Sequence, residues 1–303
     1  MKSYNLINGN IITLNTSLQR ANALTISNGK IESIDQPNSS YKTLDLNGHT
    51  IIPGFIDAHF HLKNFGKRLD MLNLKGISSL DEIAIEIESK LSSLNPDQWL
   101  IGFGWDQNLW ESQDYPDISF LNKIVPDNPV YLTRIDGHSS WVNDCAISKT
   151  GYTLDEIKTQ DGGDVINGCI MIDNAMNCFK HYLPVDTKSQ VKQWIKTAVK
   201  KTIKMGITGV HDAWQDATTI SAIQELIQEN NFPIRCYGML GSNDTSLLND
   251  FFQRGHYQSD YLTIRSVKAF IDGALGSRGA ALHKPYSDDT HNCGLILISN
   301  DDF

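Results

Sequence analysis

The sequence predicts an α/β protein that opens with a small β-domain. The first fifty residues contain three Asn-Gly pairs between short apolar runs and show no helical period. Such pairs are typical of tight turns between strands. From residue 187 onward, strand-like and helix-like segments alternate. That alternation indicates βαβ units and a parallel sheet.

Residues 1–50 are expected to form a hairpin-rich β-domain. The predicted turns are Asn8-Gly9, Asn28-Gly29 and Asn47-Gly48. The character of the sequence changes at residue 51, where an apolar run leads into a polar tip. We interpret residues 51–61 as a fully buried strand whose carboxyl end is functional.

The middle of the chain is predicted to contain one helix and two further strands. The helix covers about residues 80–94, because Ser79 and Glu82 form a capping-box pattern and apolar residues follow at helical spacing. The strands cover residues 99–104 and 130–135. Residues 151–168 are interpreted as a polar excursion.

The last third carries the βαβ signal. A helix is expected from the Thr187/Gln190 capping pattern to about Met205, with Gly206 as its stop. The segments that follow alternate between strand and helix. The predicted strands are 207–211, 233–240 and 263–271, and the predicted helices are 219–230 and 247–253.

Composition excludes several functions. The formal net charge of −9 argues against a nucleic-acid partner and against docking on an anionic membrane surface. No apolar run approaches the roughly 18 residues that span a bilayer, and the amino terminus has no signal-peptide core. Five widely spaced cysteines are typical of reduced, buried thiols. A cytoplasmic protein is expected.

The pair His59 and His61 is the sharpest chemical feature. On a strand, residues two apart point to the same side, so both imidazoles could grip one metal ion. Neutral imidazole suits zinc, iron or nickel. The alternative is a pair of polar strand-end residues without a ligand.

Several ordered motifs surround this pair. They are Ile51-Ile52-Pro53-Gly54-Phe55-Ile56-Asp57-Ala58-His59-Phe60-His61, Gly102-Phe103-Gly104-Trp105-Asp106-Gln107, Asp136-Gly137-His138-Ser139-Ser140-Trp141-Val142-Asn143, Gly206-Ile207-Thr208-Gly209-Val210-His211-Asp212-Ala213 and Val267-Lys268-Ala269-Phe270-Ile271-Asp272-Gly273. Together they resemble the amidohydrolase superfamily, in its family 3 branch that includes N-substituted formamide deformylase. The resemblance covers nearly the whole chain.

The resemblance implies a small β-domain followed by a TIM-type (β/α)8 metal-dependent hydrolase barrel. It divides the chain into the β-domain (1–50), the first barrel strand with the H-x-H pair (51–70), an α/β insertion (71–189) and barrel strands two to four (190–303). A barrel needs about 250 residues, so only about four of its eight units fit here. We therefore expect the amino-terminal part of a longer enzyme.

The resemblance also implies roles for individual residues. His59 and His61 would bind the more buried of one or two divalent metal ions, with zinc expected first. Lys268 falls at the position of the strand-four lysine that CO2 carboxylates in many members, and the carbamate bridges two metals. The alternative for Lys268 is an exposed lysine in a salt bridge.

Five further residues are substrate-pocket candidates. They are Trp105, Asp106, His138, His211 and Asp212. Packing is the alternative for Trp105, and a structural hydrogen bond is the alternative for His138. His211 and Asp212 end a predicted barrel strand, where such enzymes keep their sites, and they could instead support the ligands.

The function implied is hydrolysis, by metal-activated water, of a carbon–nitrogen bond other than a peptide bond in a small amide or formamide. The general-base aspartate is expected beyond residue 303, so this chain alone should have little activity. One alternative is an inactive half-barrel that needs a complementing chain or forms a homo-oligomer. Another is a metal-binding protein without chemistry.

Overall fold

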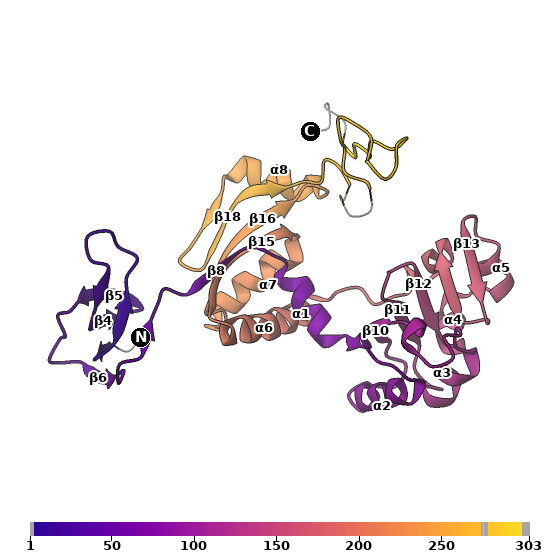
Figure 1. Cartoon of the computed structure of the whole chain (residues 1–303), viewed down its shortest axis with the longest axis horizontal. Coiled ribbons are helices and arrows are strands. Elements are labelled where there is room, and N and C mark those ends of the chain that lie inside the picture. Colours follow the sequence, from indigo (N-terminus) through magenta and orange to yellow (C-terminus); the bar gives the residue numbers. More distant parts are fainter. Residues whose placement is uncertain (1–2, 274, 276–277, 299–303) are drawn as a thin grey trace.

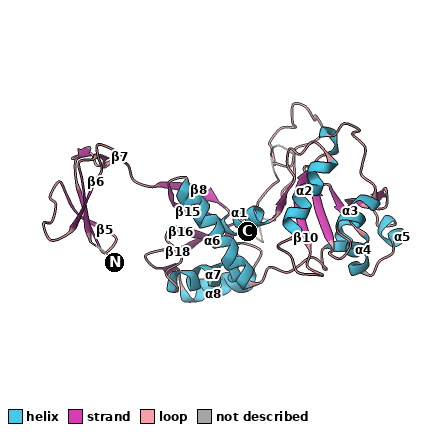
Figure 2. Ribbon diagram, turned by 90° about the horizontal axis from the view of Figure 1, so that it is seen from below, coloured by secondary structure: helices cyan, strands magenta, loops and turns pink. Residues whose placement is uncertain are grey.

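The computed structural model describes residues 3–273, 275 and 278–298. Figure 1 shows three parts along the long axis: amino-terminal sheets, a central parallel sheet with helices, and a second α/β part. The same separation is visible in the perpendicular view of Figure 2. Of the glycine-rich segment 273–279, positions 274, 276 and 277 lie outside the described residues. Within the described residues, no helix combines the length and apolarity needed to cross a membrane.

The amino-terminal part contains two small sheets. Their strands are β1 (Tyr4–Ile7), β2 (Asn10–Ile12), β3 (Arg20–Ala21), β4 (Leu24–Ser27), β5 (Lys30–Ile34), β6 (Lys42–Asp45) and β7 (Thr50–Ile51). One sheet has the order β5-β4-β1-β6, and the other has the order β3-β2-β7. Leu6, Ile11, Ala21 and Leu24 form the core between them.

The predicted hairpins are confirmed at one turn and wrong at two. Asn28 and Gly29 both have positive φ, 51° and 76°, and they join the antiparallel pair β4 and β5. At Asn8-Gly9 only the asparagine has positive φ, and β1 and β2 belong to different sheets. Asn47-Gly48 likewise carries the chain from one sheet to the other. An Asn-Gly pair favours a tight reversal but does not choose the strand that pairs next.

The central part is built on a parallel sheet. Its strands are β8 (Phe55–Phe60), β15 (Ile207–Gln215), β16 (Arg235–Gly241) and β18 (Leu262–Lys268), with the short β17 (Tyr257–Gln258) antiparallel to β18. The order is β17-β18-β16-β15-β8. Its helices are α1 (Leu62–Asp70), α6 (Lys188–Lys204), α7 (Ala217–Gln228) and α8 (Thr245–Arg254). The parallel sheet predicted for the last third is confirmed.

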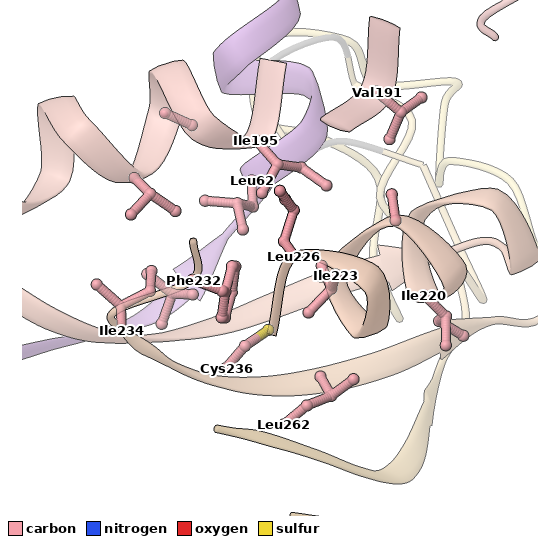
Figure 3. Close-up of a cluster of buried hydrophobic side chains, with 14 of the residues drawn as sticks. Leu62, Val191, Ile195, Ile220, Ile223, Leu226, Phe232, Ile234, Cys236 and Leu262 are labelled. Carbon is pink, nitrogen blue, oxygen red and sulfur yellow. The ribbon is translucent and has the colours of Figure 1, made fainter. Parts of the chain in front are cut away.

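One face of this sheet is buried under the helices. Strand β16 alternates along its length, so Cys236 and Leu240 are buried while Arg235 is exposed. Leu62, Ile195, Ile223, Leu226 and other apolar side chains of the four helices pack on the buried face (Figure 3). The opposite face is open to solvent over much of its area.

Strand β8 is not the fully buried strand that the sequence predicts. Phe55 is 57% exposed and Ile56 is 65% exposed. In the part of the chain that the structure describes, β8 is an edge strand that pairs only with β15. Its side chains therefore lack cover on two sides, and an apolar sequence alone does not show whether a covering partner is present.

Residues 71–189 form the second α/β part. Its strands are β9 (Leu72–Asn73), β10 (Leu100–Trp105), β11 (Val130–Arg134), β12 (Ser139–Val142), β13 (Gly163–Ile166) and β14 (Ile170–Asp173). Its helices are α2 (Leu80–Leu91), η1 (Gln107–Leu109), α3 (Ile118–Ile124), α4 (Asp144–Thr150), α5 (Leu154–Lys158) and η2 (Asn174–Phe179). The sheet order is β13-β14-β12-β11-β10-β9.

The polar excursion predicted for residues 151–168 is wrong in part. The segment contains the short helix α5 and strand β13. A capping box starts α5, in which Thr153 accepts from the backbone of Glu156 and Glu156 accepts from the backbone of Thr153. Isolated helices this short are marginal, and Ile157, which is fully buried, anchors this one to the rest of the fold.

Helix α6 gives a direct test of its predicted start. Thr187 and Gln190 form the complete capping box that the sequence indicates. We expect Thr187→Ala to lower the free energy of unfolding by about 1 kcal/mol, because the backbone N–H of Gln190 loses its acceptor. Urea unfolding followed by circular dichroism measures this. Thr187→Ser is the matched control, since it keeps the hydroxyl; equal losses in both variants would contradict the capping role.

Candidate metal centre

The carboxyl ends of the four parallel strands meet at one edge of the central sheet. His59 and His61 stand at the end of β8, and Lys268 ends β18. His211 and Asp212 were predicted to end their strand, but β15 continues to Gln215, so they lie near its middle. Parallel strands bring their carboxyl ends to a common edge, which is where enzymes built on such sheets place their sites. This edge is the candidate site.

His59 and His61 lie side by side at this edge. Their ring centroids are 5.3 Å apart and the rings meet edge to face. Between them, Phe60 packs toward the helix-covered core, so the two histidines flank it on the other side of the strand. Both histidines are exposed. Two neighbouring, accessible imidazoles are the minimum that a metal ion needs from one strand.

The ring of His61 is oriented by a backbone contact. Its Nδ1 donates a hydrogen bond to the Ala213 carbonyl oxygen at 3.0 Å. A carbonyl only accepts, so Nδ1 carries the proton and Nε2 keeps its lone pair. Metal-binding histidines are commonly held in this way by a second hydrogen bond. The residues present therefore fit a divalent cation.

Asp212 is buried directly behind this pair. Its side chain accepts hydrogen bonds from the backbone N–H of Leu62 at 2.7 Å and from Nε2 of Gln215 at 2.9 Å. Burial raises the pKa of Asp212 to about 6, although both hydrogen bonds and the charges of His61 and Lys63 act in the opposite direction. The carboxyl is thus held by two hydrogen-bond donors and is 3% exposed.

Lys268 lies on the same edge, two strands away from β15. Its register partner is Gly241 on β16, and its ammonium nitrogen lies 5.0 Å from the ring centre of Phe270. Phe270 in turn stacks on Trp214 at 4.8 Å. Lys268 is half-buried rather than fully exposed in a salt bridge. Among the described residues, no group of three or more His, Cys, Asp or Glu side chains is placed to hold a metal ion.

His211 and Asp212 point to opposite faces of β15. His211 packs against Tyr237 with the rings tilted by 48° and their centroids 5.2 Å apart, on the face away from the helices. Asp212 faces the helix side and contacts the start of α1. Of the two residues, only His211 is therefore directed toward the open face where a substrate could lie.

Trp105 lies in the interior of the second α/β part. It is fully buried, and its indole Nε1 donates to the Leu132 carbonyl at 2.7 Å. Trp110 and Trp141 surround it at centroid distances of 6.1 and 5.9 Å. The packing alternative describes Trp105 in this structure, and its ring offers no surface to a substrate here.

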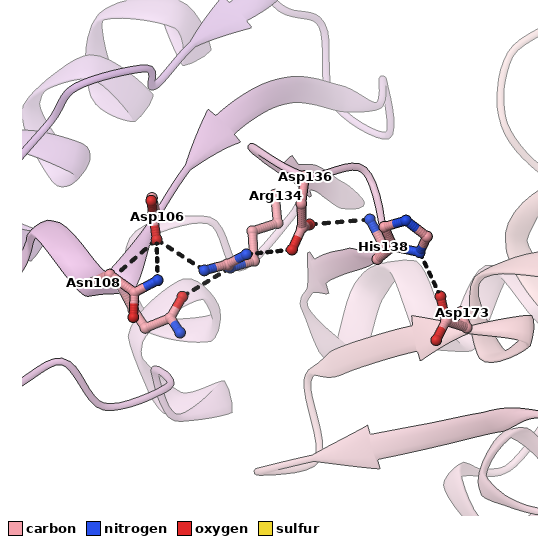
Figure 4. A network of polar contacts seen from close by, with 7 residues as sticks. Asp106, Asn108, Arg134, Asp136, His138 and Asp173 are labelled. Atoms are coloured by element: carbon pink, nitrogen blue, oxygen red, sulfur yellow. Dashed lines mark hydrogen bonds and ion pairs between the residues drawn. The ribbon is translucent and has the colours of Figure 1, made fainter. Parts of the chain in front are cut away.

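Asp106 and His138 belong to a polar network at the carboxyl ends of β10 and β11 (Figure 4). The Arg134 guanidinium donates to Asp106 at 2.9 Å and also contacts Asp136. Asp136 accepts from the backbone of His138, whose Nδ1 lies 2.8 Å from Asp173. Among the described residues, no hydrogen bond or ion pair links this network to the histidine pair on β8.

The pKa of His138 provides a test of its pairing with Asp173. Its hydrogen bond to Asp173 and the charge of that carboxylate raise the pKa above 6.5, and Asp136 adds to the effect. The attraction between protonated His138 and the Asp173 carboxylate is therefore fully present below about pH 6.5. It is lost as the pH rises through the raised pKa of His138. NMR titration should show this, and Asp173→Asn should return the pKa toward 6.5. An unchanged pKa in that variant would contradict the pairing.

Sequence reasoning missed several residues that shape the site. Gln215, Ala213, Tyr237 and Asp173 make the contacts described above. The position of Gln215 three residues after Asp212 was visible in the sequence. The Ala213 carbonyl left no signal, because any residue supplies a backbone oxygen.

Comparisons with known proteins identify relatives of this chain. A profile of the amidohydrolase family matches residues 42–302. Protein LONG AFTER FAR-RED 3 of Arabidopsis thaliana is 28% identical over 323 residues, which cover 96% of this chain and 54% of that protein. N-substituted formamide deformylase of Arthrobacter pascens is 28% identical over 160 residues, or 50% of this chain and 30% of that protein.

A solved structure extends the agreement to the fold. An uncharacterized metal-dependent hydrolase from Pyrococcus horikoshii matches with a TM-score of 0.80 and 27% identity, over 99% of this chain and 61% of that chain. The chain belongs to amidohydrolase family 3, as its motifs indicate. It spans about half the length of the Arabidopsis relative, or less for the deformylase.

Proposed function

We propose that the protein is a metal-dependent hydrolase of a carbon–nitrogen bond other than a peptide bond, in a small amide or formamide. The observation that carries the proposal is the histidine pair at the end of β8, with Nε2 of His61 left free by the bond to Ala213. The similarity to N-substituted formamide deformylase supports the substrate class. Membership of the amidohydrolase family supports the reaction type.

His59, His61 and Lys268 would hold the metal. A divalent cation at this edge supplies activation of water and polarisation of the substrate carbonyl. His61 would bind through Nε2 while its Nδ1 proton stays on the Ala213 carbonyl. Lys268, as its carbamate, would bring a carboxylate on a long arm to the same edge. His211 and Tyr237 would line the open face where the substrate binds.

We also propose that β8, β15, β16 and β18 are four consecutive strands of a (β/α)8 barrel. Their parallel pairing in chain order and the helices on one face support this arrangement. Residues 71–189 would be an insertion after the first strand. The exposed Phe55 and Ile56 lie on the edge strand β8 and support further polypeptide of the same family covering this edge of the sheet, since large apolar patches are rarely left exposed.

The reaction is tested on the protein isolated from its natural source, at its native length. We expect release of formate and amine from N-substituted formamides, loss of that release after treatment with a chelator, and recovery with zinc. Esters and small unsubstituted amides serve as the comparison substrates. Turnover that survives complete metal removal, or turnover of esters alone, would contradict the proposal.

A further inference from the structure

We propose that Asp212 is a positioning residue that caps helix α1 in place of His61 and thereby leaves the His61 imidazole free to bind a metal. The role as a metal ligand rests on the proposed function, whereas the capping geometry does not. Asp212 was a candidate for the substrate pocket or for ligand support, and the structure favours support. Four observations lead to this assignment.

The first observation is the side of the sheet on which Asp212 lies. Val210, two residues earlier on β15, is buried in the helix-covered core, and Leu62 at the start of α1 belongs to the same cluster. The carboxylate contacts the Leu62 backbone, so it lies on this buried side. His211 between them faces the other way, toward Tyr237. Asp212 is therefore separated from the open face by its own strand.

The second observation concerns the start of α1. The first N–H groups of a helix have no partner within the helix, and the residue before it usually supplies a side-chain acceptor. That residue is His61, and its side chain makes no capping hydrogen bond. Asp212 instead accepts from the Leu62 N–H at 2.7 Å. A carboxylate from a neighbouring strand thus replaces the side-chain cap.

The third observation concerns the hydrogen bond that the His61 ring makes. Nδ1 donates to the carbonyl of Ala213, the residue directly after Asp212. Two consecutive residues of β15, Asp212 and Ala213, therefore hold two consecutive residues at the junction of β8 and α1. Leu62 is held by its backbone N–H and His61 by its ring. This clamp fixes both the position of the imidazole and the nitrogen that carries the proton.

The fourth observation is the support behind the carboxylate. Gln215 is 1% exposed and donates to Asp212 at 2.9 Å. Its side-chain amide fills the space beside Gly238, where a Cβ would lie only 2.2 Å from Gln215 Oε1. A Cβ at position 238 would displace this amide, so Gly238 leaves the room in which Gln215 reaches Asp212. These contacts run from Gly238 on β16 through Gln215 and Asp212 to the start of α1, on the helix-covered side of the sheet.

The test measures the tautomer of His61 in the metal-free chain. Long-range ¹H–¹⁵N spectra at about pH 8 report which ring nitrogen is protonated. We expect proton on Nδ1 in the wild type and a mixture of tautomers in Asp212→Ala. Asp212→Asn keeps an acceptor oxygen and should restore the wild-type spectrum. Asp216→Ala is the matched control: Asp216 also caps a helix and binds Lys63 on α1, but it does not contact His61.

Co²⁺ binding to the same variants provides the second readout. Asp212→Ala should weaken binding about 10- to 100-fold, as expected for loss of an outer partner of a metal ligand, whereas Asp216→Ala should leave it within about threefold.

Gly238→Ala should shift the tautomer in the same direction as Asp212→Ala, and it carries the test if Asp212→Ala does not fold. A folded Asp212→Ala or Gly238→Ala variant with an unchanged tautomer would overturn the assignment. If the wild type binds no metal but the tautomer shifts as expected, the proposed function fails and the positioning role stands.

Discussion

His61→Ala is expected to abolish tight binding of divalent metal. The substitution removes an imidazole whose orientation the structure fixes, through its hydrogen bond to the Ala213 carbonyl. The loss of affinity should exceed the roughly 10- to 100-fold that removal of an outer partner costs. His59→Ala should behave in the same way, because the two rings lie 5.3 Å apart and would share one ion.

Equilibrium dialysis against zinc or cobalt measures this effect. His256→Ala is the control, since His256 is exposed and lies on the loop after α8, away from the histidine pair. The fold should survive His61→Ala, because α1 keeps its cap from Asp212. If His61→Ala and His256→Ala bind the same amount of metal with the same affinity, the candidate centre lies elsewhere.

The parts of the fold that the sequence predicted well are set by local signals. The Thr187/Gln190 capping box predicts the start of helix α6, and the structure confirms both its start and its end within a residue. The alternation of the last third likewise predicts β15, β16 and β18 in order. In these segments, capping, turn residues and apolar period all favour the same structure.

The errors come from features that depend on distant residues. Asn8-Gly9 and Asn28-Gly29 are identical as dipeptides, yet only the second closes a hairpin, because the pairing of β1 with β4 and β6 decides the first. The burial predicted for Ile56 depends on a neighbour for β8 that the described residues do not supply. Local sequence carries no information on either partner.

The same reasoning applies to the candidate site. The H-x-H pair is local, so the placement of both rings on one side of the strand could be anticipated from strand geometry. The role of Asp212 could not, since the backbone N–H that it holds lies 150 residues earlier in the chain. The sequence places Asp212 at the end of a strand, but only the tertiary structure shows which face it occupies.

Trp105→Ala is expected to cost about 3–5 kcal/mol of unfolding free energy, the range for truncating a large buried aromatic side chain. The indole is fully enclosed between Trp110 and Trp141, and its N–H hydrogen bond to Leu132 links β10 to β11. Alanine would leave a cavity at the centre of this core. A substrate-contact role predicts the opposite pattern, with weaker substrate binding and little change in stability.

Urea unfolding followed by far-ultraviolet circular dichroism separates these two roles for Trp105, because that signal reports mainly the backbone. Trp105→Phe retains much of the ring packing but loses the hydrogen bond, so it should fall between the wild type and alanine. Leu109→Ala, at a side chain that is 50% exposed, should change stability by less than about 0.5 kcal/mol. A change in unfolding free energy near zero for Trp105→Ala would contradict the packing role and favour substrate contact. A loss in the expected range would mean that this motif residue serves the aromatic core that shapes the second α/β part, and that substrate contacts there must come from exposed neighbours such as His138.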